Sequence, residues 1–278
     1  MKQIMLCTDL DRTLIPNGPH PESEVARDIF RKLAQREDVT LVYVTGRHMA
    51  LIEDAILTYD LPQPDFVIAD VGANIYRINE TGWHKMHNWS AHIALDWQGK
   101  THHDLYRILS VFPQLALQEQ EKQRLHKLSF YVLPELDVHT LLNDINRLLL
   151  NCDIRSNIIW SVDEETKMGL LDVLPAGANK LLALVFLMQH SNFTRDNTIF
   201  AGDSGNDVDV LMSDIPSVLV ANASDGIKRR AEAVQNEALY IAQGGYLGMN
   251  GNYSAGILEG VAHYLPDVDA WLRQQCAK

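Results

Sequence analysis

The feature that most constrains this chain is its opening stretch, residues 2–16, which reads KQIMLCTDLDRTLIP. A short apolar run, Ile4–Cys7, leads directly into Asp9 and Asp11. Apolar runs of this length, bounded by polar turn residues, are typical of a strand buried on both faces of a sheet. The two carboxylates therefore follow the carboxyl end of a predicted central strand, where open α/β sheets bind their ligands.

Two carboxylates this close repel each other unless they share a cation. The pattern therefore indicates a Mg²⁺ ion and a phosphate, with Asp9 attacking phosphorus and Asp11 protonating the leaving oxygen. Considered alone, the same residues could be an acidic turn that only caps the next helix. The other strand ends of the chain favour the first interpretation.

Length and charge exclude several classes of function. A chain of 278 residues can hold one large domain or two linked ones. Its formal charge of −12 at pH 7 argues against nucleic-acid binding, because phosphate backbones call for basic surface. No apolar run has the length of a membrane span, and the first residues lack a secretory signal. The chain has three cysteines (Cys7, Cys152, Cys276), so at least one is not in a disulfide, which indicates a reduced, cytoplasmic protein.

Further apolar runs alternate with helical patterns along the chain. They lie at Thr40–Val44, Phe66–Asp70, Thr198–Gly202, Ser217–Ala221 and Leu239–Ala242. This order predicts an α/β fold whose core is a doubly wound, Rossmann-like parallel sheet.

The strand that is predicted at Thr40–Val44 ends in Thr45 and Gly46, just before a helical pattern. Glycine lets the backbone approach an anion closely, and a helix start offers unpaired N–H donors. We therefore expect Thr45 to donate its hydroxyl to a phosphate oxygen. A Thr45 that merely caps the helix is the open alternative.

Two later motifs carry the matching charges. Lys180 begins an apolar helix, where its charge has the wrong sign for the helix dipole, so either negative charge lies nearby or the lysine is exposed. The run Thr198–Gly202 continues into GDSGND, residues 202–207, which places two acids among small residues. Asp203 is the expected third Mg²⁺ ligand, and Asp203 and Asp207 supply the counter-charge for Lys180.

Between these motifs, residues 83–171 differ in character. We predict that they form an inserted α/β cap domain, with residues 1–82 and 172–278 as the catalytic core. The start of the insert is rich in tryptophan and histidine: Trp83, His84, His87, Trp89, His92, Trp97, His102 and His103. We expect the tryptophans to pack and the histidines to be satisfied or on the surface, with sugar stacking and metal binding as the alternatives.

The motifs together carry a resemblance. Motifs one to four of the haloacid dehalogenase superfamily resemble, in order, DLDRT at 9–13, VTGR at 44–47, Lys180 and GDSGND at 202–207. The insert between the second and third motifs resembles the branch of this superfamily with an α/β cap in that position. LDVLPAGANK at 171–180 and GGYLGMNGNYSAGILEGVAHY at 244–264 look most like sucrose-phosphate phosphatases. Mannosylfructose-phosphate phosphatase is a competing match. The resemblance spans nearly the whole chain.

The resemblance implies a role for each acid. Asp9 would be the nucleophile that forms an aspartyl-phosphate, and Asp11 the general acid and then base. Asp9, Asp203 and the backbone carbonyl of Asp11 would hold Mg²⁺. Asp207 would orient Lys180 or a metal-bound water, and Thr13 would fix the loop after Asp11.

The remaining roles concern the phosphate and the sugar. Thr45, the Gly46 N–H and Lys180 would stabilise the phosphoryl oxygens, Asn206 would bind one of them, and Arg47 would reach the substrate. A sugar pocket needs polar side chains and an aromatic ring, which the end of the insert offers. The candidates there are Trp160, Ser161, Asp163, Glu164, Lys167 and Asp172.

Of these candidates we predict Asp163 and Lys167 as sugar contacts, with solvated turn charges as the alternative. The expected function is Mg²⁺-dependent hydrolysis of a sugar phosphate, first of all sucrose 6-phosphate. A mutase-like phosphotransferase and a catalytically silent sugar-binding partner of a synthase stay open, although the intact acids count against silence. We expect a stand-alone monomer that has at most transient contact with a sugar-phosphate synthase.

Overall fold

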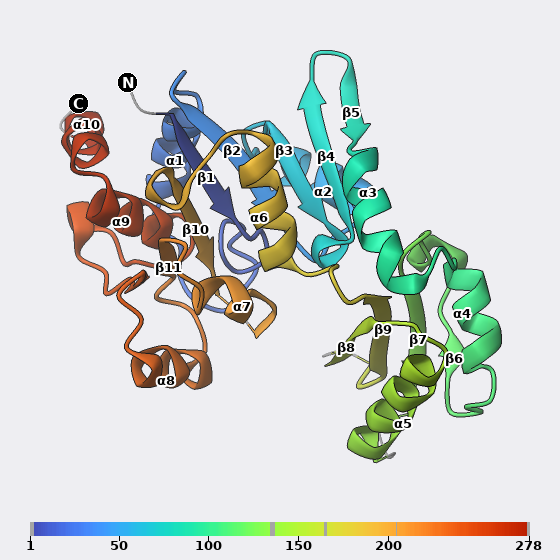
Figure 1. Cartoon of the computed structure of the whole chain (residues 1–278). Helices are drawn as coiled ribbons and strands as arrows, with labels where there is room; N and C mark the ends of the chain where they lie inside the picture. The colour runs from blue at the N-terminus through green and yellow to red at the C-terminus, as the bar shows by residue number, and fades with distance from the viewer. Residues whose placement is uncertain (1–2, 134–136, 164–165, 204, 277–278) are drawn as a thin grey trace.

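The chain folds into two units, each built on its own sheet (Figure 1). The computed structural model describes residues 3–133, 137–163, 166–203 and 205–276. The larger unit holds an eight-stranded sheet and the smaller a four-stranded one. The α/β fold with a doubly wound parallel sheet and an inserted second α/β unit, predicted from the sequence, is confirmed.

The large sheet has the order β12-β11-β10-β1-β2-β3-β4-β5. Its parallel strands are β1 (Ile4–Thr8), β2 (Val39–Val44), β3 (Phe66–Ala69), β10 (Thr198–Gly202), β11 (Ser217–Leu219) and β12 (Leu239–Ile241). The antiparallel hairpin is β4 (Asn74–Asn79) and β5 (Gly82–Lys85). Chain order runs outward from β1 in both directions, so β1 and β10 flank the topological switch point, where such sheets bind ligands.

Helices cover both faces of this sheet. One face carries α1 (Ala26–Ala34), α2 (Met49–Thr58), α9 (Ser254–Tyr264) and α10 (Pro266–Cys276). The other carries α3 (His87–Ala94), α6 (Lys180–His190), α7 (Val208–Leu211) and α8 (Asp225–Val234). Strand β1 is apolar throughout because Ile4 and Leu6 face the first layer while Met5 and Cys7 face the second.

Helix α9 lies unusually close to β11. A Cβ atom at Gly260 would come within 2.1 Å of Val218, so only glycine permits this approach. The preceding residue, the buried Glu259, accepts hydrogen bonds from the N–H groups of Gln243 and Gly244, at 2.8 and 3.0 Å. The glycine-rich segment before α9 is therefore anchored to the helix that follows it.

The smaller sheet has the order β6-β7-β9-β8. Its strands are β6 (Ala116–Leu117), β7 (Leu128–Val132), β8 (Ser156–Val162) and β9 (Gly169–Pro175), all antiparallel to their neighbours. Its helices, α4 (His102–Leu109) and α5 (Val138–Asn151), share a hydrophobic cluster with alternate residues of these strands. We call residues 95–175 the small unit.

The predicted domain boundaries do not coincide with sheet membership. Trp83 pairs with Ile78 in the large sheet, and Trp89 of α3 is buried in the large unit. Asp172, which was expected in the core, pairs with Ser129 in the small sheet. We therefore move the proposed boundaries to 94/95 and 175/176.

The connection between β3 and β4 has an unusual backbone. Asp70, Val71 and Gly72 have φ values of 50°, 56° and 98°, and a β-branched residue in this region is rare. The N–H groups of Asp70 and Val71 donate to the carbonyls of Arg47 (3.0 Å) and Thr45 (3.1 Å). The strained segment therefore holds the loop that follows β2.

Replacing Gly72 with alanine is expected to destabilise the fold by about 2–4 kcal/mol. The added Cβ would lie 2.4 Å from the backbone carbonyl of Asn179, at a φ that already disfavours alanine. Gly82→Ala is the matched control, because Gly82 has a φ of 111° but no atom within 4 Å of that Cβ position. Chemical denaturation measures both, and equal losses would contradict the packing argument.

Candidate active site

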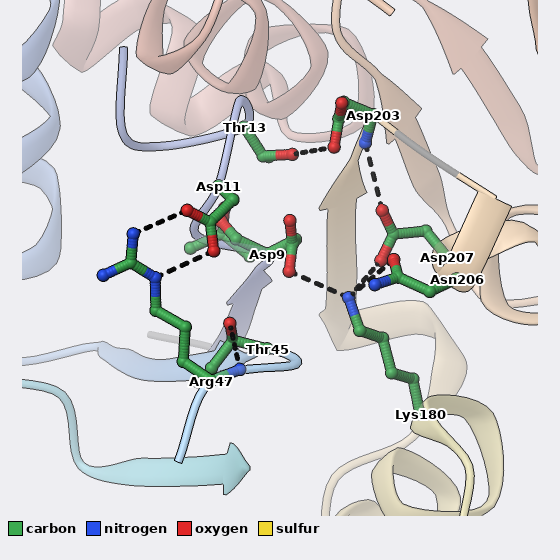
Figure 2. A network of polar contacts seen from close by, with 10 residues as sticks. Asp9, Asp11, Thr13, Thr45, Arg47, Lys180, Asp203, Asn206 and Asp207 are labelled. Carbon is green, nitrogen blue, oxygen red and sulfur yellow. Dashed lines mark hydrogen bonds and ion pairs between the residues drawn. The ribbon is translucent and has the colours of Figure 1, made fainter. Parts of the chain in front are cut away.

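Side chains from segments far apart in the sequence converge at the carboxyl edge of the large sheet. Figure 2 shows Asp9 and Asp11 after β1, Thr45 and Arg47 after β2, Lys180 at the start of α6, and Asp203, Asn206 and Asp207 after β10. The backbone joins the two central segments, since the Asp9 N–H donates to the carbonyl of Ala201 at 2.9 Å.

Lys180 is the centre of this cluster. Its side chain is fully buried, and Nζ donates to Asp9 Oδ1 (2.8 Å), Asp207 Oδ1 (2.6 Å) and Asn206 Oδ1 (3.1 Å). Burial lowers the pKa of Lys180, but the carboxylates of Asp207 and Asp9 outweigh burial and raise it overall. The lysine is therefore a fixed positive charge at a helix start that disfavours one.

Three carboxylates outnumber this single ammonium group. Ligand oxygens of Asp9, Asp203 and Asp207 all lie within 4.8 Å of one another, and each residue is buried. Burial raises the pKa of Asp9 to about 8, although Lys180 opposes it. Burial, followed by the charge of Asp207, raises the pKa of Asp203 to about 6. This excess of buried negative charge fits a hard divalent cation.

The trio is also the one group of its kind in the part of the chain that the structure describes, when His, Cys, Asp and Glu are considered as ligands. None of the histidines near the start of the insert belongs to it. Asp203 is held in place by two hydrogen bonds. Thr13 Oγ1 donates to Asp203 Oδ1 at 3.3 Å, and the Asp203 N–H donates to Asp207 Oδ2 at 3.2 Å.

Asp11 is engaged differently. The guanidinium of Arg47 donates to both of its oxygens, at 2.6 and 2.8 Å, and the Asn17 amide donates at 2.7 Å. Burial raises the pKa of Asp11, but the bonds from Arg47 and Asn17 outweigh it and lower the pKa overall. The structure thus pairs Arg47 with Asp11, and contact of Arg47 with the substrate stays a prediction.

The loop after β2 lies beside the loop after β10. Thr45 is completely buried, and its Oγ1 accepts the N–H of Arg47 at 3.2 Å, which leaves the hydroxyl proton available to another acceptor. A Cβ placed on Gly46 would lie 3.7 Å from Val71 and 3.9 Å from Asn206. Gly46 and Asn206 are therefore neighbours at the same edge as Asp9.

The whole-chain comparison decides the family. A family model described as sucrose-6F-phosphate phosphohydrolase matches residues 2–265. The chain belongs to this family. Its members are phosphoric monoester hydrolases, and the resemblance found in the sequence is confirmed.

Individual relatives agree with this family. The chain is 49% identical to a putative HAD-like hydrolase of Nitrosococcus oceani, over 98% of this chain and 75% of the relative. It is 27% identical to sucrose-phosphatase 1 of Nicotiana tabacum over 94% of its length, but it spans only 59% of that protein. The sucrose-phosphatase of Synechocystis sp. PCC6803, solved with sucrose and phosphate, superposes with a TM-score of 0.74 at 25% identity, covering 95% of this chain and 98% of that one.

The two sugar contacts predicted from the sequence, Asp163 and Lys167, lie in the small unit. Asp163 accepts from the N–H (2.7 Å) and hydroxyl (2.8 Å) of Thr166 in the turn between β8 and β9, and Lys167 is exposed in the same turn. Glu164 lies outside the described residues.

Two other candidates have structural partners. Trp160 is half-buried and packs against the small unit's hydrophobic cluster. Asp172 accepts from Ser129 Oγ at 2.6 Å and pairs with Lys127 at 3.1 Å. Trp89 and Trp97 are buried, which confirms that they pack.

Sequence reasoning missed several residues that organise the site. Asn17 holds Asp11, as described above. Asn222 Nδ2 donates to the Arg12 carbonyl at 2.6 Å, and its Oδ1 accepts the N–H of Tyr253 at 2.8 Å. Only Asn17 had a local signal, since it precedes a glycine in a turn-like stretch.

In the described part of the chain, no helix is both long and apolar enough to cross a membrane.

Proposed function

We propose that the chain is a Mg²⁺-dependent phosphatase that hydrolyses a sugar phosphate, with sucrose 6-phosphate as the first candidate. The observation that supports this most is the buried Lys180 between Asp9 and Asp207, with Asp203 beside them. The sugar is suggested by the similarity to sucrose-phosphatases, one of them solved with sucrose and phosphate.

Asp9, Asp203 and the backbone carbonyl of Asp11 would hold the cation. When bound, Mg²⁺ would neutralise the crowded carboxylates and polarise the phosphoryl group. Asp207, which already accepts from Lys180 and from the Asp203 N–H, would keep both in place.

The reaction would proceed in two displacements on phosphorus. A carboxylate oxygen of Asp9 attacks, the bond to the sugar oxygen breaks, and Asp11 gives that oxygen a proton. Water then attacks phosphorus, Asp11 takes its proton, the bond from phosphorus to the Asp9 oxygen breaks, and inorganic phosphate leaves. Since an ionised carboxylate cannot donate a proton, Asp11 must be protonated before the first displacement, and the bidentate pair with Arg47 opposes that protonation.

The surrounding donors would stabilise the phosphoryl oxygens. The Thr45 hydroxyl, the Gly46 N–H, Lys180 and the Asn206 amide all lie at the edge of the sheet where Asp9 emerges. Donors fixed in this way before reaction are most effective in a site that excludes water. We propose that the small unit acts as the cap that excludes water and contacts the sugar, through Asp163 and Lys167 among others.

Release of inorganic phosphate from a panel of esters tests the function. Sucrose 6-phosphate is expected to exceed p-nitrophenyl phosphate in kcat/KM by about 100-fold or more, and only with Mg²⁺. Mannosylfructose phosphate and glucose 6-phosphate belong in the panel as competitors. Equal rates would indicate an unselective phosphatase, phosphoryl transfer without release would indicate a phosphotransferase, and no turnover of any ester would contradict the proposal.

Replacing Asp203 with alanine is expected to raise the Mg²⁺ concentration for half-maximal activity by about tenfold or more. The change removes one of the few charged ligands available to the cation. Magnesium titrations of the variant, of wild type and of Asp209→Ala measure this, because Asp209 is an exposed acid of the following helix α7. An unchanged titration in Asp203→Ala would rule out its role as ligand.

A further inference from the structure

Two segments of the chain cross between the large unit and the small unit. In Figure 1 the first crossing is at the lower end of α3, and the second is the segment between β9 and α6. The first crossing is a single helical turn, Leu95–Trp97. Asp96, in the middle of this turn, is only 7% exposed, so its charge is buried where the two units meet.

The Asp96 side chain joins the two crossings. Its carboxylate accepts the N–H of Gly177, in the second crossing, at 2.6 Å. The same carboxylate forms an ion pair with Arg155, the residue that precedes β8. The Asp96 carbonyl accepts the N–H of Arg155 at 2.9 Å, and the Ala176 N–H donates to the Arg155 carbonyl at 3.1 Å. The buried Asp96 thus links the first crossing, the second crossing and the residue that precedes strand β8 of the small sheet.

The second crossing leads directly to the catalytic cluster. Gly177 stands three residues before Lys180. Within this interval the Asn179 N–H donates to the Gly177 carbonyl at 3.1 Å, and the Asn157 side chain donates to the Ala178 carbonyl at 3.0 Å. This short, hydrogen-bonded segment therefore connects the small unit directly to the first residue of α6.

The contact is tight inside and open outside. A Cβ at Gly177 would lie 3.1 Å from Asp96 Oδ2, so glycine allows the carboxylate to approach the backbone. On the outer side, a cavity of about 310 Å³ is lined by Leu95, Asp96, Arg155 and Gly177 among others. The Arg155 side chain is 69% exposed there, so it can swing away without repacking a core.

We propose that Asp96 is a positioning residue that sets the angle of the small unit relative to Lys180 and Asp9. It thereby favours substrates whose leaving group is large enough to contact both units. A charged acceptor suits this role, because hydrogen bonds to a carboxylate are stronger than those to a neutral group. The discrimination part of this inference rests on the proposed sugar-phosphatase function, whereas the geometric part does not.

Kinetics on two substrates test the discrimination. In Asp96→Ala, kcat/KM for sucrose 6-phosphate is expected to fall at least tenfold, while that for p-nitrophenyl phosphate changes less than threefold. Asp96→Asn keeps an acceptor for the Gly177 N–H and loses the charge, so its kcat/KM for sucrose 6-phosphate is expected to lie between those of wild type and Asp96→Ala. Asp144→Asn is the matched control, because Asp144 forms an exposed ion pair with Arg147 on α5. Equal losses on both substrates, or no loss on either, would overturn the proposal.

Amide hydrogen exchange tests the geometry without any substrate. Exchange of the Gly177 amide and of its neighbours up to residue 179 is expected to be at least tenfold faster in Asp96→Ala, with the strands of the large sheet unchanged. Unchanged exchange at Gly177 would overturn the proposal even if activity fell. If wild type hydrolysed no sugar phosphate, the proposed function would fail and the exchange result would still decide the role of Asp96. If Asp96→Ala did not fold, Asp96→Asn would serve for both measurements.

Discussion

Replacing Asp9 with asparagine is expected to lower turnover of the sugar phosphate by about 10³-fold or more, as expected when a covalent catalyst is removed. An amide cannot attack phosphorus, yet it has nearly the same size and its oxygen can still accept from Lys180. The fold should therefore be retained while the chemistry is lost. Phosphate release under single-turnover conditions, with the melting temperature measured alongside, gives both quantities.

Asp54→Asn is the control for this change, because Asp54 is an exposed acid on α2, away from the cluster. It should leave turnover within twofold of wild type. Acid-quenched protein should carry phosphate in wild type and none in Asp9→Asn. Turnover of Asp9→Asn within tenfold of wild type would count against Asp9 as nucleophile.

Replacing Lys180 with methionine is expected to reduce kcat/KM by about 10²–10³-fold, since a fixed positive charge beside the phosphoryl oxygens is lost. The same change leaves Asp9 and Asp207 buried without their cation. Breaking a buried pair on one side costs about 3–5 kcal/mol, so the free energy of unfolding should fall by that amount in magnesium-free buffer.

Added Mg²⁺ should restore part of this stability, because a divalent cation can replace the missing positive charge between the carboxylates. Denaturation with and without the metal measures the effect. Lys32→Met, on the exposed side of α1, is the control and should change neither stability nor kinetics appreciably. A Lys180→Met variant as stable as wild type without metal would contradict the ion-pair arrangement.

The convergence of the acids could be predicted because parallel strands end at a common edge. Asp9 and Asp203 each come directly after a continuous apolar run, and such runs have one main explanation, a strand buried on both faces. Once both runs are placed in one parallel sheet, their following residues must be near each other. Negative charge near Lys180 could be predicted from the sign of its own charge at a helix start. Asp207 is one of the two expected partners, but the other ion pair is with Asp9 rather than Asp203.

The division into units could not be predicted as well. The apolar run at 170–174 looks like a core strand, but it belongs to the small sheet as part of β9, and only its pairing with β7 and β8 shows this. Strand β5 was missed because Gly82–Lys85 is short, lies at the sheet's edge and has Trp83 as its one apolar residue. Helix α10 was missed because few of its residues are apolar: Val268 and Leu272 are buried, and Trp271 is half-buried against the same core.

The partners of individual side chains were also beyond the sequence. Arg47 was expected to reach the substrate, and its pairing with Asp11 through Nε and Nη2 was not foreseen. Asp96, a lone acid in an aromatic stretch, carried no signal at all. Pairings of this kind depend on the three-dimensional approach of loops, which neither periodicity nor charge pattern specifies.

The close seating of α9 on β11 bears on how substrate preference evolves in this chain. Gly260 allows α9 to pack closely on β11, and Glu259 anchors the segment before the helix. In the same region Asn222 accepts from the Tyr253 N–H and donates to the Arg12 carbonyl. Sequence similarity to relatives in this stretch therefore reflects the packing of the fold. Under the proposed function, a change of substrate preference would leave these residues unchanged and would fall on residues outside this stretch.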